Sequence, residues 1–194
     1  KGIMVNSGSS ALYLAADLMD YELGSEIITP ALTFSTTVAP LIKKGWVPAF
    51  IDVEEGTYNL DAAKVEEMIT PKTKAMVIPN LIGNLPNWKM LREIADKHNL
   101  FVLEDSADTL GAEIDGASSG RFTDMSTTSF YGSHIINCAG NGGMLCVNSD
   151  AYYNRGRLLR SWGRSSSIFV ESEKIEDRFN VEIEGFPYAA KFVF

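Results

Sequence analysis

Short runs of β-branched and apolar residues alternate along this chain with amphipathic stretches long enough to form helices. Residues 26–30, 75–79 and 101–103 are typical of buried strands. Apolar residues at helical spacing mark the stretch between the last two runs, from Trp88 to Ala95. Because neighbouring parallel strands need a crossover, usually a helix, this alternation predicts βαβ units. We therefore expect an α/β protein with a mostly parallel sheet flanked by helices.

The same patterns predict the remaining elements. Apolar residues recur at helical spacing after the turn at residues 7–10, up to Leu18, and Gly24 stands where that helix is expected to have ended. Asp61 is expected to cap a helix over residues 62–69. Further helices are expected at 36–44 and 152–162, and further strands at 47–53, 125–131 and 143–147.

Charge and cysteine content restrict the classes of partner. The chain holds 17 Lys and Arg against 25 Asp and Glu, a formal net charge of −8, and no basic run. This disfavours nucleic acid and anionic membrane surfaces as partners. No apolar run approaches the roughly 18 residues that a membrane span needs. Cys138 and Cys146 are the only cysteines, so a disulfide framework is excluded and a reduced cytoplasm is expected.

The two ends of the sequence suggest a piece of a longer protein. The chain begins with an apolar stretch that runs directly into the turn at residues 7–10, and it ends on residues that alternate as in a strand. We therefore expect both a missing start and a missing end. Residues 165–186 are charged and irregular, and we expect them to form a lobe or loop whose partners lie in the missing part.

The turn at residues 7–10, Ser-Gly-Ser-Ser, is a candidate phosphate site. It joins a strand to the start of a helix, where backbone N–H groups and hydroxyls can face an anion at the positive end of the helix. Serine is also a good helix cap, so a plain cap is an equal alternative. Neither Gly-x-Gly-x-x-Gly nor Gly-x-x-x-x-Gly-Lys occurs, which disfavours a Rossmann dehydrogenase and a P-loop enzyme.

Asp105 directly follows an apolar strand, at the kind of edge where open α/β sheets place ligands. A carboxylate at a buried strand end is costly unless a cation or hydrogen-bond donors meet it. The protonated heterocyclic nitrogen of a cofactor would meet that need. A helix cap for Ala107 and the residues after it is the simpler interpretation, and the sequence alone favours it.

His134 lies between the strand expected at residues 125–131 and a glycine-rich loop. Taken singly, such a histidine is more often a structural residue than a base. The other histidine, His98, closes a helix and is interpreted as a solvated cation. The two histidines and two cysteines match no zinc-site spacing, so no metal is expected, and Cys138 and Cys146 are expected to pack near the sheet.

Placed in order, these features resemble the DegT/DnrJ/EryC1/StrS family of sugar aminotransferases, which are fold-type I pyridoxal-phosphate enzymes acting on nucleotide-linked keto-sugars. The resemblance runs from Val5 to Arg164. It implies that residues 1–164 form an N-terminally truncated, cofactor-binding large domain of that fold type, and that residues 165–194 connect to a small domain that is missing here. Its motifs are Val-Asn-Ser-Gly-Ser-Ser-Ala-Leu at 5–12, Thr-Pro-Ala-Leu-Thr-Phe at 29–34, Phe-Ile-Asp-Val at 50–53 with Tyr-Asn-Leu at 58–60, Glu-Asp at 104–105 and Ser-Phe-Tyr at 129–131.

The resemblance also implies a set of cofactor-binding residues. Phe34 would stack on the pyridine ring. Asp105 would pair with the ring nitrogen and keep it protonated, which lets the ring act as an electron sink. Asp108 falls where relatives carry a polar side chain near the ring hydroxyl. The positions that would hold the phosphate are Gly8, Ser9, Ser10 and Ser129.

One position departs from the aminotransferase pattern. Where those enzymes carry the lysine that binds the cofactor covalently, this chain has His134, and no lysine occurs between Lys97 and Lys174. A histidine here resembles the sugar 3-dehydratase branch of the family, which holds pyridoxamine 5′-phosphate noncovalently. The implied substrate is a nucleotide-linked 4-keto-6-deoxyhexose that loses its C3 hydroxyl, with His134 as the base that moves the proton.

Two subtypes of such dehydratases are known, one of them with a cysteine-bound 2Fe–2S cluster. No cysteine follows Cys146, and a cluster normally takes four thiolates, so none is expected. The chain thus resembles the cluster-free branch of GDP-4-keto-6-deoxymannose 3-dehydratases, in which glutamate restores the amine form of the cofactor. A homodimer is implied by the resemblance alone. An ordinary sugar aminotransferase and a non-catalytic relative remain as alternatives.

Overall fold

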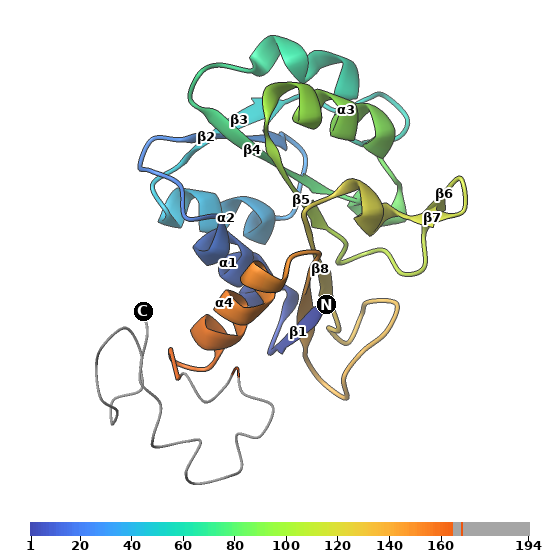
Figure 1. Cartoon of the computed structure of the whole chain (residues 1–194). Coiled ribbons are helices and arrows are strands. Elements are labelled where there is room, and N and C mark those ends of the chain that lie inside the picture. The colour runs from blue at the N-terminus through green and yellow to red at the C-terminus, as the bar shows by residue number, and fades with distance from the viewer. Residues whose placement is uncertain (165–167, 169–194) are drawn as a thin grey trace, which may run out of the picture.

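The structure is a computed structural model that describes residues 1–164 and 168. Its centre is a seven-stranded sheet in the order β1-β9-β8-β5-β4-β2-β3 (Figure 1). The pairs β2-β3, β2-β4, β4-β5 and β5-β8 are parallel, while β9 pairs antiparallel with β1 and β8. The predicted mostly parallel sheet is confirmed. The strands are β1 (Gly2–Val5), β2 (Glu26–Pro30), β3 (Val47–Ile51), β4 (Thr73–Pro79), β5 (Phe101–Asp105), β8 (Met125–Ser129) and β9 (Gly143–Val147), with a separate pair of β6 (Glu113–Ile114) and β7 (Ala117–Ser118).

Helices cover both faces of this sheet. Helices α1, α2 and α4 lie on one face and α3 lies on the other (Figure 1). Successive strand residues point to opposite faces, so Ile27 packs in the core beside α1 and Ile28 in the core beside α3, where Trp88 is fully buried. The four α-helices are α1 (Gly8–Met19), α2 (Ser35–Lys43), α3 (Trp88–His98) and α4 (Asp150–Arg160).

The predicted helix over residues 62–69 is wrong. This segment forms two short 3₁₀ turns, at Ala62–Lys64 and Glu66–Met68. Asp61 does cap the first turn, since its side chain accepts a hydrogen bond from Ala63 N. A segment this short gains little from helix propagation, and Ile69 is already extended as the chain approaches Pro71.

The end of α1 also differs from the expectation. The helix ends at Met19, because Asp20 takes a left-handed conformation (φ 46°) and its N–H bonds to Ala16 O. Gly24 instead lies in the turn before β2, where its N–H donates to Gly45 O. The connecting segment expected at residues 165–194 lies outside the described residues, apart from residue 168.

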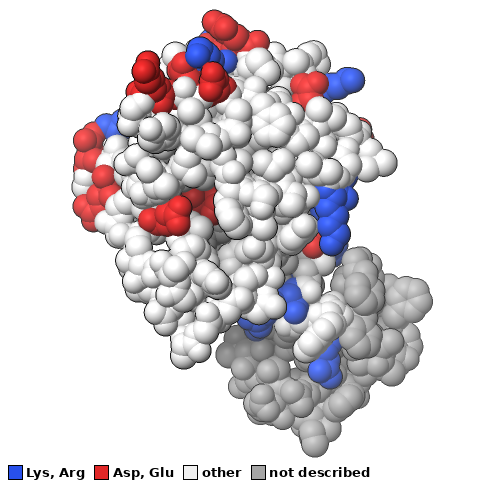
Figure 2. All heavy atoms as spheres, turned by 180° about the vertical axis from the view of Figure 1, so that it is seen from behind, with Lys and Arg blue, Asp and Glu red and all other residues white. Residues whose placement is uncertain are grey.

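Surface charge agrees with the net negative composition. In the view of Figure 2, acidic side chains gather along the upper and left margins, and basic side chains lie mostly at the lower right. The middle of that face carries few charged side chains. No helix in the described part of the chain is both long and apolar enough to cross a membrane.

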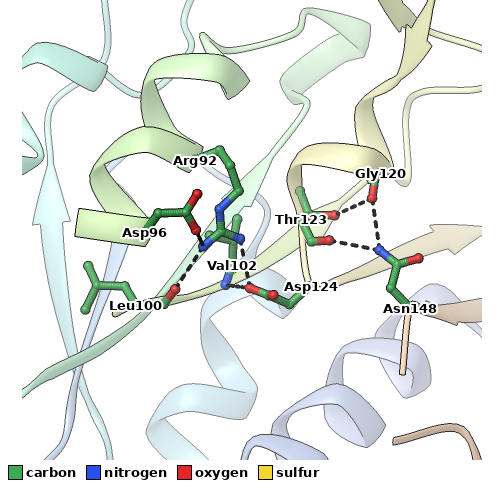
Figure 3. A network of polar contacts seen from close by, with 8 residues as sticks. All are labelled: Arg92, Asp96, Leu100, Val102, Gly120, Thr123, Asp124 and Asn148. Carbon is green, nitrogen blue, oxygen red and sulfur yellow. Dashed lines mark hydrogen bonds and ion pairs between the residues drawn. The ribbon is translucent and has the colours of Figure 1, made fainter. Parts of the chain in front are cut away.

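A polar network at the amino-terminal edge of β5 and β8 ties α3 to the sheet (Figure 3). Asp124, just before β8, accepts hydrogen bonds from Val102 N (2.8 Å) and from Arg92 Nη1 (3.1 Å). Arg92 also pairs with Asp96 at 2.9 Å, one turn further along α3. Asp124 is therefore the acceptor that joins β5, α3 and the start of β8.

We expect Asp124→Ala to lower the free energy of unfolding by about 1–2 kcal/mol, because two donors lose a charged acceptor that is partly exposed. Urea unfolding followed by circular dichroism measures this loss. Asp96→Ala is the matched control, since Asp96 binds the same guanidinium but is mostly exposed, and it should cost less than about 0.5 kcal/mol. Equal losses in both variants would contradict the assignment.

Candidate active site

A cavity of about 480 Å³ opens at the carboxyl ends of the parallel strands. Its walls come from the first turns of α1 and α2, from the ends of β4, β5 and β8, and from the loop between β8 and β9. Every residue predicted for the site lines this cavity except Ser10. Loops at this edge of an open α/β sheet are the usual place for a ligand.

The turn before α1 serves as a helix cap and also lines the cavity. Ser7 is the N-cap, and its Oγ accepts a hydrogen bond from Ser10 N at 3.1 Å and donates to Ser10 Oγ at 3.0 Å. Ser10 is thus part of the cap, whereas Gly8 and Ser9 face the cavity. The cap interpretation therefore holds for Ser7 and Ser10, and Gly8 and Ser9 stay candidates for a phosphate site.

Two glycines allow this turn to lie close to its neighbours. A Cβ atom on Gly8 would lie 2.8 Å from Ser129 Cβ, and one on Gly143 would lie 2.3 Å from the carbonyl of Ser7. The start of α1 consequently packs closely against the last residue of β8 and the first residue of β9. No lysine or arginine of the described residues lines the cavity, so the positive end of α1 is the feature there that favours an anion.

Asp105 ends β5 and is 7% exposed. Its Oδ2 accepts a hydrogen bond from Thr37 Oγ1 at 2.8 Å, and its Oδ1 accepts a longer one from Ala107 N at 3.3 Å. Burial raises the pKa of the Asp105 carboxyl, while these two donors oppose the rise and the nearby Asp108 and Glu104 add to it. A cationic group in the cavity would stabilise the charged carboxylate.

The helix-cap interpretation of Asp105 is wrong. No helix begins at Ala107, and the residues up to β6 form turns and bends. The hydrogen bond from Ala107 N closes a local turn instead. Hydrogen bonds therefore orient the Asp105 side chain, but no cation among the described residues pairs with it. A protonated ring nitrogen of a ligand could take that place.

His134 lies in the loop after β8, with its side chain 23% exposed. Its Nε2 is 3.7 Å from Asp108 Oδ1, and its ring meets the Tyr131 ring edge-on at 5.8 Å. Its Nδ1 is buried and has no hydrogen-bond partner among the described residues. A histidine with neither nitrogen in a hydrogen bond does not match a satisfied structural residue.

The sequence interpretations of His98 and of the two cysteines can also be compared with the structure. His98 is the last residue of α3 as predicted, and its Nε2 lies 2.7 Å from Glu66 Oε1. Cys146 packs in β9, but Cys138 is exposed in the loop between β8 and β9, so its expected packing near the sheet is wrong. The described residues contain no cluster of histidine, cysteine and acidic side chains suited to a metal.

The structure adds residues that the sequence did not indicate. Glu104 is 1% exposed, and its Oε1 accepts hydrogen bonds from Asn80 Nδ2 at 2.6 Å, Ser106 Oγ at 2.7 Å and Ser119 Oγ at 2.5 Å. Asn80 lines the cavity, and its Oδ1 accepts from Trp88 Nε1 at 2.9 Å. The Glu-Asp pair at the strand end was the only sequence signal. Its two side chains point to opposite faces of the sheet, so one meets the cavity and the other braces its wall.

Comparisons with known proteins show what this chain is similar to. A sequence profile of the DegT/DnrJ/EryC1/StrS aminotransferase family matches residues 1–185. GDP-perosamine synthase of Caulobacter vibrioides is 40% identical over 161 residues, which are 83% of this chain and 43% of that protein. A dTDP-4-dehydro-2,6-dideoxy-D-glucose 3-dehydratase of Saccharopolyspora spinosa is 38% identical over 172 residues, covering 84% of this chain and 37% of that protein.

A similar solved structure is the Escherichia coli GDP-4-keto-6-deoxy-D-mannose-3-dehydratase with bound hydrated pyridoxal phosphate. Its TM-score is 0.84 at 28% identity, with 96% of this chain and 51% of that chain covered. The chain thus spans less than half the length of the two sequence relatives above.

Gly143→Ala should disturb the start of α1, because the added methyl group has no room beside the Ser7 carbonyl. Overpacking of this kind costs about 1–3 kcal/mol. We expect a lower melting temperature and weaker binding of inorganic phosphate, measured by differential scanning fluorimetry with and without phosphate. Gly132→Ala is the control, since its Cβ would be 3.9 Å from the nearest atom. A loss in Gly132→Ala as large as in Gly143→Ala would refute the close approach.

Asp105→Asn should change how the ligand-free protein responds to pH. The pKa of Asp105 is raised by burial, so the native state binds more protons than the unfolded state between the ordinary aspartate value, near 3.9, and the raised one. Across that window the wild type loses up to about 1.4 kcal/mol of stability per pH unit as pH rises. The variant should lack this loss, which denaturant unfolding at several pH values measures. Parallel stability profiles would contradict the prediction.

Proposed function

The chain belongs to the DegT/DnrJ/EryC1/StrS aminotransferase family, and we propose that it is the cofactor-binding domain of a pyridoxamine-phosphate-dependent sugar 3-dehydratase. The cofactor class is pyridoxal or pyridoxamine 5′-phosphate. The single observation that carries the dehydratase assignment is His134. It stands in the loop after β8, faces the cavity and has no lysine beside it in the cavity lining.

The cavity residues suit the cofactor in size, charge and direction. Gly8, Ser9 and Ser129 would hold its phosphate at the positive end of α1. Phe34, the N-cap of α2, is 69% exposed and would cover one face of the ring. Asp105 would bind the ring nitrogen in its protonated form.

When bound, the cofactor supplies an amine that can join to a keto-sugar and a ring that can take up electrons. The residues of this chain supply position and proton transfer. Asp105 would present its carboxylate to the ring nitrogen, oriented by the hydrogen bond from Thr37 Oγ1. Its burial removes competing water and so strengthens the contact with a positive ring.

His134 is suited to move the proton. Imidazole titrates near neutrality, so one side chain can accept a proton and later return it to a departing hydroxyl. Neither ring nitrogen is held by a hydrogen bond from the described residues, because Nδ1 has no partner and Nε2 is 3.7 Å from Asp108. The Tyr131 ring and the Asp108 carboxylate flank the imidazole, which limits its rotation.

The substrate proposed is a nucleotide-linked 4-keto-6-deoxyhexose. Named relatives act on GDP-linked and dTDP-linked sugars. One solved relative, a GDP-4-keto-6-deoxymannose-3-dehydratase, holds a pyridoxal phosphate–glutamate adduct, which supports glutamate as the amino donor. We also propose a homodimer, a cytoplasmic location and a missing small domain, on the strength of the family.

A nucleotide-sugar aminotransferase is the second candidate, because GDP-perosamine synthase is 40% identical to this chain. That activity would require a lysine bound covalently to the cofactor. Borohydride reduction of the protein loaded with pyridoxal phosphate, followed by peptide mass spectrometry, separates the candidates. A cofactor-labelled lysine would establish the aminotransferase, and a freely dialysable cofactor supports the dehydratase. Failure to bind either cofactor form would indicate a non-catalytic relative.

His134→Asn should slow removal of the C3 hydroxyl by about 10²–10⁴-fold, the usual contribution of a positioned base. The rate is measured as release of the deoxygenated sugar from GDP-4-keto-6-deoxymannose in protein loaded with pyridoxamine phosphate. His98→Asn is the matched control, because the chain has only two histidines and His98 lies outside the cavity. It should keep the wild-type rate. Full activity in His134→Asn would remove the basis of the dehydratase assignment.

A further inference from the structure

Thr37 is the residue that holds the Asp105 carboxylate most closely. It lies in the first turn of α2, is 1% exposed, and is 68 residues away from Asp105 in sequence. Its Oγ1 donates to Asp105 Oδ2 at 2.8 Å, whereas the Ala107 N–H reaches Oδ1 only at 3.3 Å. A helical threonine often turns its hydroxyl back to a carbonyl of its own helix. Here that hydroxyl is committed to another element.

We propose that Thr37 is a positioning residue, whose hydroxyl fixes the Asp105 carboxylate in the direction of the cofactor ring. The proposal rests on the proposed function, in which Asp105 binds the ring nitrogen. Thr37 itself would not touch the reacting atoms. It would act by holding one carboxylate oxygen, so that the side chain keeps a single orientation in the empty protein.

The charges around Asp105 explain why this hydroxyl matters. The two acidic neighbours that act on it are Asp108, in the turn after β5, and Glu104, on the opposite face of the strand, and both disfavour a further negative charge. The nearby imidazole, His134, faces Asp108 and not Asp105. Among the described residues, two hydrogen-bond donors therefore offset the cost of burying the charged carboxylate, and Thr37 is the closer of them.

The same contact secures the start of α2. Its N-cap, Phe34, has no side chain suited to capping, and the first turn closes through Thr37 N and Phe34 O at 3.0 Å. Without a side-chain cap, the bond from Thr37 to Asp105 is what joins this end of the helix to β5. The residue that would stack on the ring and the residue that would bind the ring nitrogen are thereby linked through one threonine.

A ligand pair tests this directly. Pyridoxamine 5′-phosphate and its 1-deaza analogue share the phosphate and the ring shape, but the analogue has no ring nitrogen for Asp105. Thr37→Val should bind pyridoxamine phosphate about 10- to 100-fold more weakly, the range expected when a charged acceptor loses one hydrogen bond. Its affinity for the deaza analogue should change less than about threefold. Thr37→Ser, which keeps the hydroxyl, should restore the wild-type difference between the two ligands.

A second measurement needs no ligand. In the empty protein, Thr37→Val removes a donor to the charged form of Asp105, so the pH-dependent part of the unfolding free energy should move to higher pH. In an Asp105→Asn background the same substitution should have no pH-dependent effect. The cycle of wild type, Thr37→Val, Asp105→Asn and the double variant tests the proposal even if the wild type binds neither ligand. Failure to bind either ligand would overturn the proposed function but not the role of Thr37 in holding Asp105.

Two outcomes would overturn the positioning role. Equal losses of affinity for both ligands would mean that Thr37 supports the cavity as a whole and has no specific effect on Asp105. A pH-dependent effect of Thr37→Val that persists without the Asp105 charge would mean the same in the empty protein. A loss confined to pyridoxamine phosphate, rescued by Thr37→Ser and absent from the Asp105→Asn background, supports it.

Discussion

The cavity is organised around a buried carboxylate that has no cation beside it in the described part of the chain. Asp105 ends a central strand of a parallel sheet, where burial raises its pKa and two hydrogen-bond donors hold it in place. A protein keeps such a group only where something offsets its desolvation. The parallel topology provides the setting, because it brings the carboxyl ends of neighbouring strands to one edge and leaves the loops free to line a site.

Charge is distributed unevenly along this cavity. One part of its wall is the positive terminus of α1, in a turn packed closely by Gly8 and Gly143. Another part carries the carboxylates of Asp105 and Asp108, and no lysine or arginine of the described residues lines the cavity. A ligand with an anionic group at one end and a cationic ring at the other is complementary to this arrangement, and that is the charge pattern of the proposed cofactor.

Overall similarity and local chemistry answer different questions here. Aminotransferases and 3-dehydratases both occur among the relatives at comparable identity, so the fold is shared and does not separate the two activities. The proposed difference between the two activities is one side chain, which in the aminotransferase would bind the cofactor covalently and in the dehydratase would only exchange a proton. In the proposed function His134 would be of the second kind. Its Nδ1 has no hydrogen-bond partner among the described residues, and its Nε2 lies 3.7 Å from Asp108 Oδ1.

Local sequence patterns were sufficient for the strands of the seven-stranded sheet, most of the helices and the order of the motifs, because hydrophobic periodicity and turn residues act over a few positions. They did not indicate the short pair β6 and β7. They marked Asp105 and His134 as candidates, but only the family resemblance gave these two residues a role at a cofactor. They failed at residues 62–69, where a short segment settled into 3₁₀ turns, and at Cys138, which is exposed. The bond from Thr37 to Asp105 and the Glu104–Asn80–Trp88 network were decided only by the tertiary structure. Each joins separate elements, and the partner of a buried polar group depends on how those elements pack.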